Sequence, residues 1–427
     1  MSKPVKKTRL HGWHLKRGAN MAIFGSYDMP LWYPSGAKEE HLVVLTRAGI
    51  FDTSHMSVVI VKGPGARDLL QVCFSKNLAA CIGKDQKPLT PGRSVYGVFL
   101  NEAGEVIDDA IVFQIDDALF MVVVNAGMGG GVSAHLQGYS GSRKAAVVDL
   151  SDQVGKLDVQ GPQAARIISR IVKSPQEVFV QLPYFSFKGH FDAALPTSEK
   201  VILTDGTPIL LSRTGYTGEF GFELFVAPDK FVDLWQMLID AGQPSGMLPC
   251  GLAARDSLRA GAVLPLSHQD IGTWLFKNHP WPFALPYEID GRGFTKDFVG
   301  AVALQRSDSG QYTVPFAGFD LRKVAAADPA VVLDDKERDI GRVLTCATDM
   351  AIGRFEGRIF STASPDKPVD FTPRGLSCGF VKVTNPLKPG QIVRLKDKRR
   401  TIDIEIVDDI RPDRTARKPL ANFLGNE

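Results

Sequence analysis

The chain has 427 residues, 44% apolar and 23% charged, which is long enough for two or three domains and ordinary for a globular protein. Its 50 Lys and Arg against 47 Asp and Glu give a net charge of +3, too balanced to favour nucleic acid or an anionic membrane as partner. The 5 cysteines are scattered without a C-x-x-C pair, and neither a secretory signal nor an apolar run of membrane-spanning length is present, so we expect a cytoplasmic protein without a disulfide framework or a zinc site.

The chain begins with an aromatic-rich strand and turn over residues 21–33 and a helix over 37–48. A short unit then occurs twice: an Asp-x-Ser motif precedes a strand and a Gly-Pro pair that opens a helix. The motif starts at Asp52 and again at Asp149, which lie 11 and 12 residues before the glycine of their Gly-Pro pairs. The recurrence predicts a duplicated βα building block and two related domains, with chance similarity of two Gly-Pro helix starts as the alternative.

A hairpin of strands 94–100 and 106–114 carries two adjacent carboxylates, Asp108 and Asp109, in an otherwise apolar run. Adjacent strand residues face opposite sides, so only one carboxylate can face a given cavity. Asp108 shares its face with two small residues that would leave room for a ligand. We therefore expect Asp108 to be a catalytic acid or base with a perturbed pKa; a salt bridge at a sheet edge is the alternative.

The glycine cluster at 127–131 follows a predicted strand at 119–124, which is a context typical of dinucleotide sites. Its spacing does not match G-x-G-x-x-G, and no acidic ribose partner is evident. A dinucleotide site is therefore not expected.

The loop at 213–223 lies between predicted strands 208–211 and 220–226 and contains two glycines that permit a tight turn. It presents an arginine, Tyr216 and Glu219. A flat heterocycle with N–H donors could stack on Tyr216 and donate two hydrogen bonds to Glu219. The alternative is an ordinary hairpin with a polar tip.

Asp229 is placed to cap a following amphipathic helix, and another helix starts near 249. In the second helix Arg255 and Arg259 share a face, as a solvated pair or as a clamp for an anion. Residues 274–287 are too rich in proline for regular structure and are expected to form an aromatic wall. From Val314 onward the chain is β-rich and is expected to close as a separate all-β domain.

These motifs together resemble the glycine cleavage T-protein (aminomethyltransferase) family and its folate-dependent relatives. The resemblance extends over roughly residues 18–410 and rests on the segments 51–56, 104–109, 124–126, 160–162, 213–223 and 251–259. It implies an α+β, three-domain cloverleaf, with two related α/β domains and a C-terminal all-β, barrel-like domain around a central folate cavity. The expected division is residues 1–57 with 150–250, 58–149 with 251–310, and 311–427.

The resemblance also implies transfer of a one-carbon unit to N5 of tetrahydrofolate. Carried over by motif, Asp108 is the catalytic residue near the reacting nitrogens, Glu219 reads the pterin donors and Tyr216 is a wall of the site. The other positions that match folate contacts are Met56, Asn125, Tyr184 and Arg255, and Tyr287, which stands where the family usually has tryptophan.

The chain departs from the family pattern at Glu105, at 260–262, at 279–282 and in an extra segment at about 354–374. We expect these changes to flank the substrate entrance. They predict a demethylase-like enzyme that takes a methyl or methylene group from a small N-, O- or S-linked donor. The alternative is a true aminomethyltransferase acting on a lipoylated carrier protein. A non-catalytic folate-binding regulator is a further alternative, against which the retained Asp108 argues.

Overall fold

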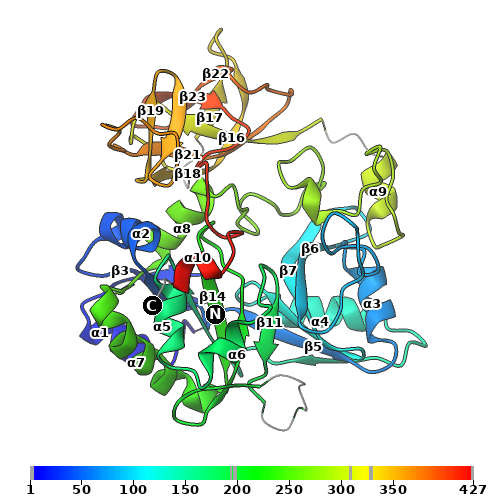
Figure 1. The fold of residues 1–427 in the computed structure, drawn as a ribbon. Coiled ribbons are helices and arrows are strands. Elements are labelled where there is room, and N and C mark those ends of the chain that lie inside the picture. Colours follow the sequence, from blue (N-terminus) through cyan, green and yellow to red (C-terminus); the bar gives the residue numbers. More distant parts are fainter. Residues whose placement is uncertain (1–3, 193–194, 196–199, 307–309, 327–329, 425–427) are drawn as a thin grey trace.

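The computed structural model describes residues 4–192, 195, 200–306, 310–326 and 330–424. Two lobes that mix helices and strands lie side by side, and a β-rich lobe lies across their upper end (Figure 1). This arrangement confirms the predicted α+β architecture with a C-terminal barrel. Among the described residues, no helix combines the length and the hydropathy needed to cross a membrane.

The first lobe is built on a mixed sheet whose helices cover one face. Its strands, in spatial order, are β11 (Phe187–Gly189), β13 (Pro208–Ser212), β14 (Gly221–Val226), β10 (Gly155–Gln160), β4 (Gly49–Asp52) and β15 (Leu248–Pro249), and β12 (Val201–Ile202) pairs with β13. The helices are α1 (His11–Lys16), α2 (Ala37–Thr46), α5 (Ala164–Ser169), α6 (Pro175–Phe179) and α7 (Phe231–Gly242). A small sheet of β1 (Lys6–Lys7), β3 (Tyr27–Trp32) and β2 (Asn20–Phe24) lies beside them.

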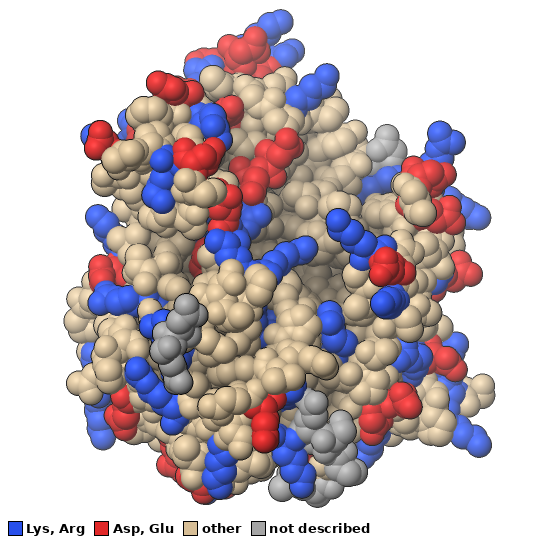
Figure 2. All heavy atoms as spheres, in the orientation of Figure 1, with Lys and Arg blue, Asp and Glu red and all other residues tan. Residues whose placement is uncertain are grey.

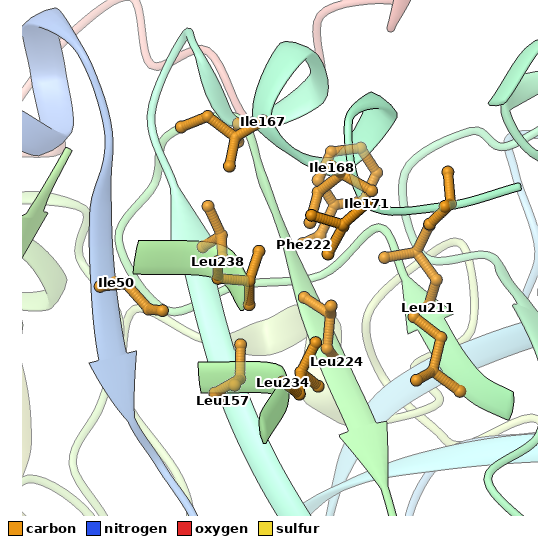
Figure 3. Packing of buried hydrophobic residues seen from close by; sticks show 14 of the residues in the cluster. Ile50, Leu157, Ile167, Ile168, Ile171, Leu211, Phe222, Leu224, Leu234 and Leu238 are labelled. Atoms are coloured by element: carbon orange, nitrogen blue, oxygen red, sulfur yellow. The ribbon is translucent and has the colours of Figure 1, made fainter. Parts of the chain in front are cut away.

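The core of this lobe fills the space between the sheet and helices α5 and α7 (Figure 3). Leu157 and Leu224 from the strands meet Ile168 from α5 and Leu234 from α7, and all are buried. Each such side chain contributes about 1.5–3 kcal/mol through burial alone. The apolar stripe predicted for α7 is confirmed. The predicted cap is wrong: Asp229 lies within a short 3-10 turn (Pro228–Lys230), and among the described residues no side-chain hydrogen bond caps α7.

The second lobe contains an antiparallel sheet backed by α3 (Ala66–Cys73) and α4 (Gly129–Gly138). Its strands, in spatial order, are β6 (Arg93–Leu100), β7 (Val106–Asp116), β8 (Leu119–Val124), β5 (Ser57–Lys62) and β9 (Ala146–Asp149). The helices α8 (Leu252–Gly261) and α9 (Ala301–Arg306) lie in the connection to the last lobe.

The strands of the β-rich lobe close into a barrel in the described part of the chain. Their order is β16 (Tyr312–Gly318), β21 (Leu376–Val383), β18 (Asp339–Asp349), β17 (Val331–Leu333), β22 (Ile392–Lys396) and β23 (Thr401–Ile406). A separate hairpin of β19 (Ile352–Phe355) and β20 (Arg358–Ser361) opens the extra segment, and α10 (Ala421–Leu424) follows the barrel.

The repeated unit has the same local structure in both copies. Asp52 accepts hydrogen bonds from the backbone and side chain of Ser54 at 3.0 and 2.7 Å, and Asp149 accepts the equivalent bonds from Ser151 at 2.8 and 2.6 Å. The glycine of each Gly-Pro pair has a positive φ, 112° in the first copy and 126° in the second, which favours glycine. The two copies of the predicted βα unit therefore have the same local structure. The first copy leads into β5 and the second into β10, one strand in each sheet.

The helix-free faces of the two sheets pack against each other. Val58, Met121 and Val123 from the second sheet meet Leu210 and Phe225 from the first in one buried apolar cluster. Side chains on these faces therefore point toward the other lobe, whereas side chains on the opposite faces point toward helices. This distinction decides which polar strand residues can reach a ligand.

Candidate functional site

A cavity of about 1660 Å³ lies where the three lobes meet. Its wall takes residues from β6 and β7, from the loop before β14, from α8, and from the segments 347–350 and 408–417 of the last lobe. Figure 2 shows a hollow at the centre of the molecule, with Lys and Arg side chains gathered around it. A site of this size, formed jointly by several lobes, is typical of a binding site for a sizeable ligand.

The structure brings some of the predicted ligand-contacting residues together in the cavity wall and places others outside it. The cavity is lined by Met56, Asn125, Tyr184, Tyr216 and Arg255. Their contacts with folate stay a prediction. Asp108, Glu219 and Tyr287 do not line the cavity, and each has a definite structural place elsewhere.

The two adjacent aspartates lie on opposite faces of β7, and which of them is catalytic stays a prediction. Asp109 lines the cavity, on the same face as Ile111, whereas Asp108 does not. Asp108 is fully buried and shares its face with Ala110, which packs in the core beneath α3 and α4. Val106, the other small residue beside Asp108, packs in a different cluster with Trp281.

Hydrogen bonds fix both carboxylates. Asp109 accepts from the Tyr96 hydroxyl at 2.8 Å and from Asn125 Nδ2 at 2.5 Å. Asp108 accepts from the Asn125 backbone N–H and from Nδ2, both at 2.8 Å, and from Ser267 Oγ at 2.7 Å. Burial and the neighbouring negative charge of Asp108 raise the pKa of Asp109, and burial raises the pKa of Asp108. A carboxylate facing the cavity with a raised pKa can exchange a proton near neutral pH.

The predicted role of Glu219 as the reader of a heterocycle edge is not supported by its orientation. Its carboxylate is buried against the last lobe, where it accepts from Arg411 Nε at 3.1 Å and from Thr415 Oγ1 at 2.5 Å. Arg411 also pairs with Asp349 at 2.5 Å. Glu219 therefore joins the loop to the barrel lobe.

Glu223, which the sequence interpretation missed, lies where Glu219 was expected. It is on β14, two residues before Phe225 on the face that meets the other lobe, and it lines the cavity. Its Oε1 accepts from Lys156 Nζ at 2.6 Å, and its Oε2 accepts from the Thr214 hydroxyl. A signal was present in the sequence: Glu223 is the one charge in the apolar run 220–226.

Lys156, also missed, belongs to a chain of buried charges across β10 and α8. Its ammonium contacts Asp158 Oδ1 at 2.7 Å in addition to Glu223, and Arg255 donates to Asp158 Oδ2 at 2.7 Å. Burial alone would raise the pKa of Asp158, but Lys156 and Arg255 hold it below its ordinary value, at about 2. The wall of the cavity is thus a set of paired charges with fixed geometry.

Tyr216 presents an aromatic face to the cavity. Its hydroxyl donates to the Pro265 carbonyl, and the Arg255 guanidinium lies 4.9 Å from the ring centroid. Arg255 and Arg259 both line the cavity and both have protein carboxylates as partners, so they are not a solvated pair, and a clamp for a ligand anion stays a prediction. Arg259 pairs with Asp256 at 2.7 Å and also contacts Asp270.

Tyr287 lies away from the cavity, beside Phe294, with the two ring centroids 5.1 Å apart. The aromatic wall predicted over 274–287 forms in part, because Pro280 and Phe283 do line the cavity. Trp281 is instead fully buried and donates its Nε1–H to the Val263 carbonyl at 2.8 Å. Phe276, Ala284 and Leu285 join Trp281 in one buried apolar cluster.

Most of the departures from the family pattern also lie outside the cavity wall. Ala260 is buried against the barrel, and position 261 has no room for a side chain, since a Cβ there would lie 1.9 Å from Asp349 Oδ2. Glu105 accepts a hydrogen bond from Asn101 Nδ2 within its own turn. Of the substituted positions, Ala262 and Pro280 line the cavity, and no residue of the fully described segment 354–374 does. The expectation that these changes surround the entrance is therefore mostly wrong.

Comparisons with known proteins agree with this geometry. The family model of the GCVT N-terminal domain matches residues 10–275. An aminomethyltransferase of Streptomyces coelicolor is 37% identical over 309 residues, which cover 71% of this chain and 74% of that protein. Another, of Streptomyces avermitilis, is 34% identical over 411 residues, which cover 93% and 99%. The crystal structure of glycine cleavage system aminomethyltransferase T from Bartonella henselae matches with a TM-score of 0.73 and 25% identity, covering 97% of this chain and 99% of that one.

Proposed function

Because the chain belongs to the GCVT family of aminomethyltransferases and is a one-carbon-group transferase, we propose that it moves the carbon of an aminomethyl group from a lipoylated carrier protein to tetrahydrofolate. The observation that carries this proposal is the convergence of Glu223, Tyr216 and Asp109 on one cavity. They come from β14, from the loop before it and from β7, and together they offer a carboxylate acceptor, an aromatic face and a proton-exchanging group.

The binding half of the proposal rests on Glu223. A carboxylate has about four lone-pair sites, and Lys156 and Thr214 occupy one on each oxygen. One site on each oxygen remains, which suits the two parallel N–H donors on the amino-pyrimidine edge of a pterin. Tyr216 supplies a face for the ring. Glu223 thus takes the role that the sequence interpretation gave to Glu219.

The catalytic half rests on Asp109. Transfer from an aminomethyl thioether breaks the C–S and C–N bonds of the donor, and it releases a thiol and ammonium. Each product gains one of the hydrogens that the two folate nitrogens lose, so the reacting carbon needs a neighbour that relays protons. Asp109, held by Tyr96 and Asn125, can accept and return a proton and stabilise a developing positive charge.

The donor is the point at which the proposal departs from the sequence expectation. The changes that suggested a small methylated donor are mostly accounted for by core packing and by the Asp349–Arg411 ion pair. The relatives that match along most of the chain are aminomethyltransferases. Both observations favour the aminomethyl donor over a demethylase reaction.

The test compares donors directly. The protein is incubated with tetrahydrofolate and either an aminomethylated lipoyl carrier protein or a panel of N-, O- and S-methyl compounds. We expect ammonia and 5,10-methylene-tetrahydrofolate from the carrier alone. Formation of 5-methyl-tetrahydrofolate from a methylated compound, with no ammonia from the carrier, would overturn the proposed donor.

A further inference from the structure

Asp158 and Glu223 face each other beside the cavity, and Glu223 lines it. They are directly paired in the register between the antiparallel strands β10 and β14, and both are at most 5% exposed. Carboxylates in this position repel each other, and burial strengthens the repulsion. Without compensation, one of them would take up a proton at neutral pH.

The positive charge of Lys156 compensates the negative charges of both carboxylates. It lies two residues before Asp158 on the same strand face, is 2% exposed, and places its ammonium 2.7 Å from Asp158 Oδ1 and 2.6 Å from Glu223 Oε1. Its third N–H contacts Thr53 Oγ1 at 3.2 Å. Because an ammonium has three donors, Lys156 has none left for a ligand. Its effect on a ligand must act through Glu223.

We propose that Lys156 is a positioning residue whose ion pairs hold the Glu223 carboxylate in the orientation that a pterin needs, despite the facing carboxylate of Asp158. This inference rests on the proposed function for the identity of the ligand. It assigns to β10 a part in ligand recognition that none of the family motifs in the sequence indicated.

The other charged and titratable groups near Glu223 cannot replace Lys156. Arg255 contacts the other carboxylate, Asp158, through Oδ2. Burial lowers the pKa of His55 to about 4, so its ring is neutral, and burial raises the pKa of Tyr184, so its hydroxyl is neutral too. The groups around Glu223 are Lys156 and Asp158 from β10, Arg255 from α8, His55 before β5, Tyr184 before β11, and the hydroxyls of Thr53 and Thr214. Three arginines also lie near Tyr184: Arg213 donates to backbone carbonyls, Arg414 pairs with Asp409, and Arg417 lies over the Tyr184 ring.

If Lys156 is removed, the proton should go to Glu223 rather than to Asp158, because Arg255 still holds Asp158 ionised. A protonated Glu223 presents a hydroxyl donor where the ligand also donates. The loss of affinity should therefore be large at low pH and should disappear as the pH rises and Glu223 ionises again.

The experiment measures binding of 5-formyltetrahydrofolate, which resists oxidation, by calorimetry from pH 6 to pH 9. We expect Lys156→Arg to follow the pH profile of the parent, which contains the contribution of Asp109. Relative to the parent, Lys156→Met should lose roughly tenfold in affinity at pH 6, as for a carboxyl that is about nine-tenths protonated at that pH, and it should recover most of the loss by pH 9. Lys382→Met, which removes another buried lysine far from the cavity, in the barrel, is the matched control and should leave binding unchanged.

Second substitutions separate this role from a merely structural one. Adding Asp158→Ala to Lys156→Met should restore the pH profile of the parent, because the repelling partner is gone. In a Glu223→Gln background, Lys156→Met should add no pH dependence. A loss of affinity that is independent of pH, or one that Asp158→Ala makes worse, would overturn the inference.

A readout without ligand keeps the inference testable if the protein does not bind folate. Relative to the parent, Lys156→Met should lose unfolding free energy as the pH rises above the ordinary glutamate pKa, because its folded state then binds a proton more tightly than its unfolded state. Failure of the parent to bind folate would refute the proposed function. A stability difference that does not change with pH would refute the role of Lys156.

Discussion

Glu223 and Glu219 stand four residues apart in the same loop and strand, and the structure assigns them opposite tasks. Glu223 faces the cavity, and Glu219 faces Arg411 of the barrel lobe. The substitution Glu→Gln at each position changes the charge and almost nothing of the shape. Glu223→Gln should therefore lower the affinity for folate, whereas Glu219→Gln should lower the free energy of unfolding.

The magnitude at Glu223 follows from its fixed neighbours. Lys156 must still be met by an oxygen, so the glutamine carbonyl turns to Lys156 and its NH₂ group turns to Thr214 and the cavity. One ligand N–H then loses a charged acceptor, at a cost of about 1.5–3 kcal/mol. That cost corresponds to roughly a 10- to 150-fold weaker affinity. Calorimetry with 5-formyltetrahydrofolate at pH 7.5 measures it.

At Glu219 the expected change is in stability. Arg411 retains Asp349 as a partner, so the loss should be that of one charged hydrogen bond, about 1.5–3 kcal/mol of unfolding free energy. Folate affinity should change less than threefold, as for a residue outside the cavity wall. If Glu219→Gln weakens binding and Glu223→Gln does not, the assignment of the two carboxylates is wrong.

Three further predictions concern the other buried charges. Asp109→Asn should lower the rate of single-turnover transfer at saturating folate by roughly 10²–10⁴-fold, whereas Asp108→Asn should mainly lower the free energy of unfolding. An inactive Asp108→Asn together with an active Asp109→Asn would contradict the proposal that Asp109 is the catalytic carboxylate. Because the folded-state pKa of Asp109 is raised, thermal unfolding should show Asp109→Asn gaining stability over the parent as the pH rises above the ordinary aspartate pKa, and a constant difference would argue against a raised pKa. Arg411→Met should cost about 3–5 kcal/mol in denaturant unfolding, since it leaves Asp349 and Glu219 buried without their shared cation, and a cost below 1 kcal/mol would show that the clamp is dispensable.

The sequence was sufficient where a pattern depends on local geometry. The stripe of α7 and the two Asp-x-Ser units are set by residues within one element, and the structure has them as predicted. Asp229 marks the limit of this reasoning. It is a good capping residue by type, but the proline before it starts a 3-10 turn and moves the helix start to Phe231.

The errors at the site have one physical origin. Alternation along a strand separates two faces but does not tell which face meets helices and which meets the other lobe. For β7, the small residues beside Asp108 suggested space for a ligand. In the fold Ala110 packs beneath α3 and α4, and Val106 packs against Trp281. We expected Glu219 to bind the ligand because it belongs to the loop motif. The alternation of side chains along β14 places Glu223 on the cavity side.

The layer arrangement supplies the missing information and also explains how the site is held. Asp109 and Glu223 occupy equivalent positions in different sheets: each lies on the helix-free face, at the point where apolar packing between the sheets gives way to the cavity. The distance between them is therefore set by how the lobes are joined, and no single element controls it. Arg411 joins the loop that carries Tyr216 to the barrel through Glu219 and Asp349, and Arg259 joins α8 to the barrel through Thr345 at 2.9 Å. Arg411 lies outside the cavity, whereas Arg259 is part of its wall. We expect both arginines to keep the two halves of the site in register, because each connects an element that lines the cavity to the barrel.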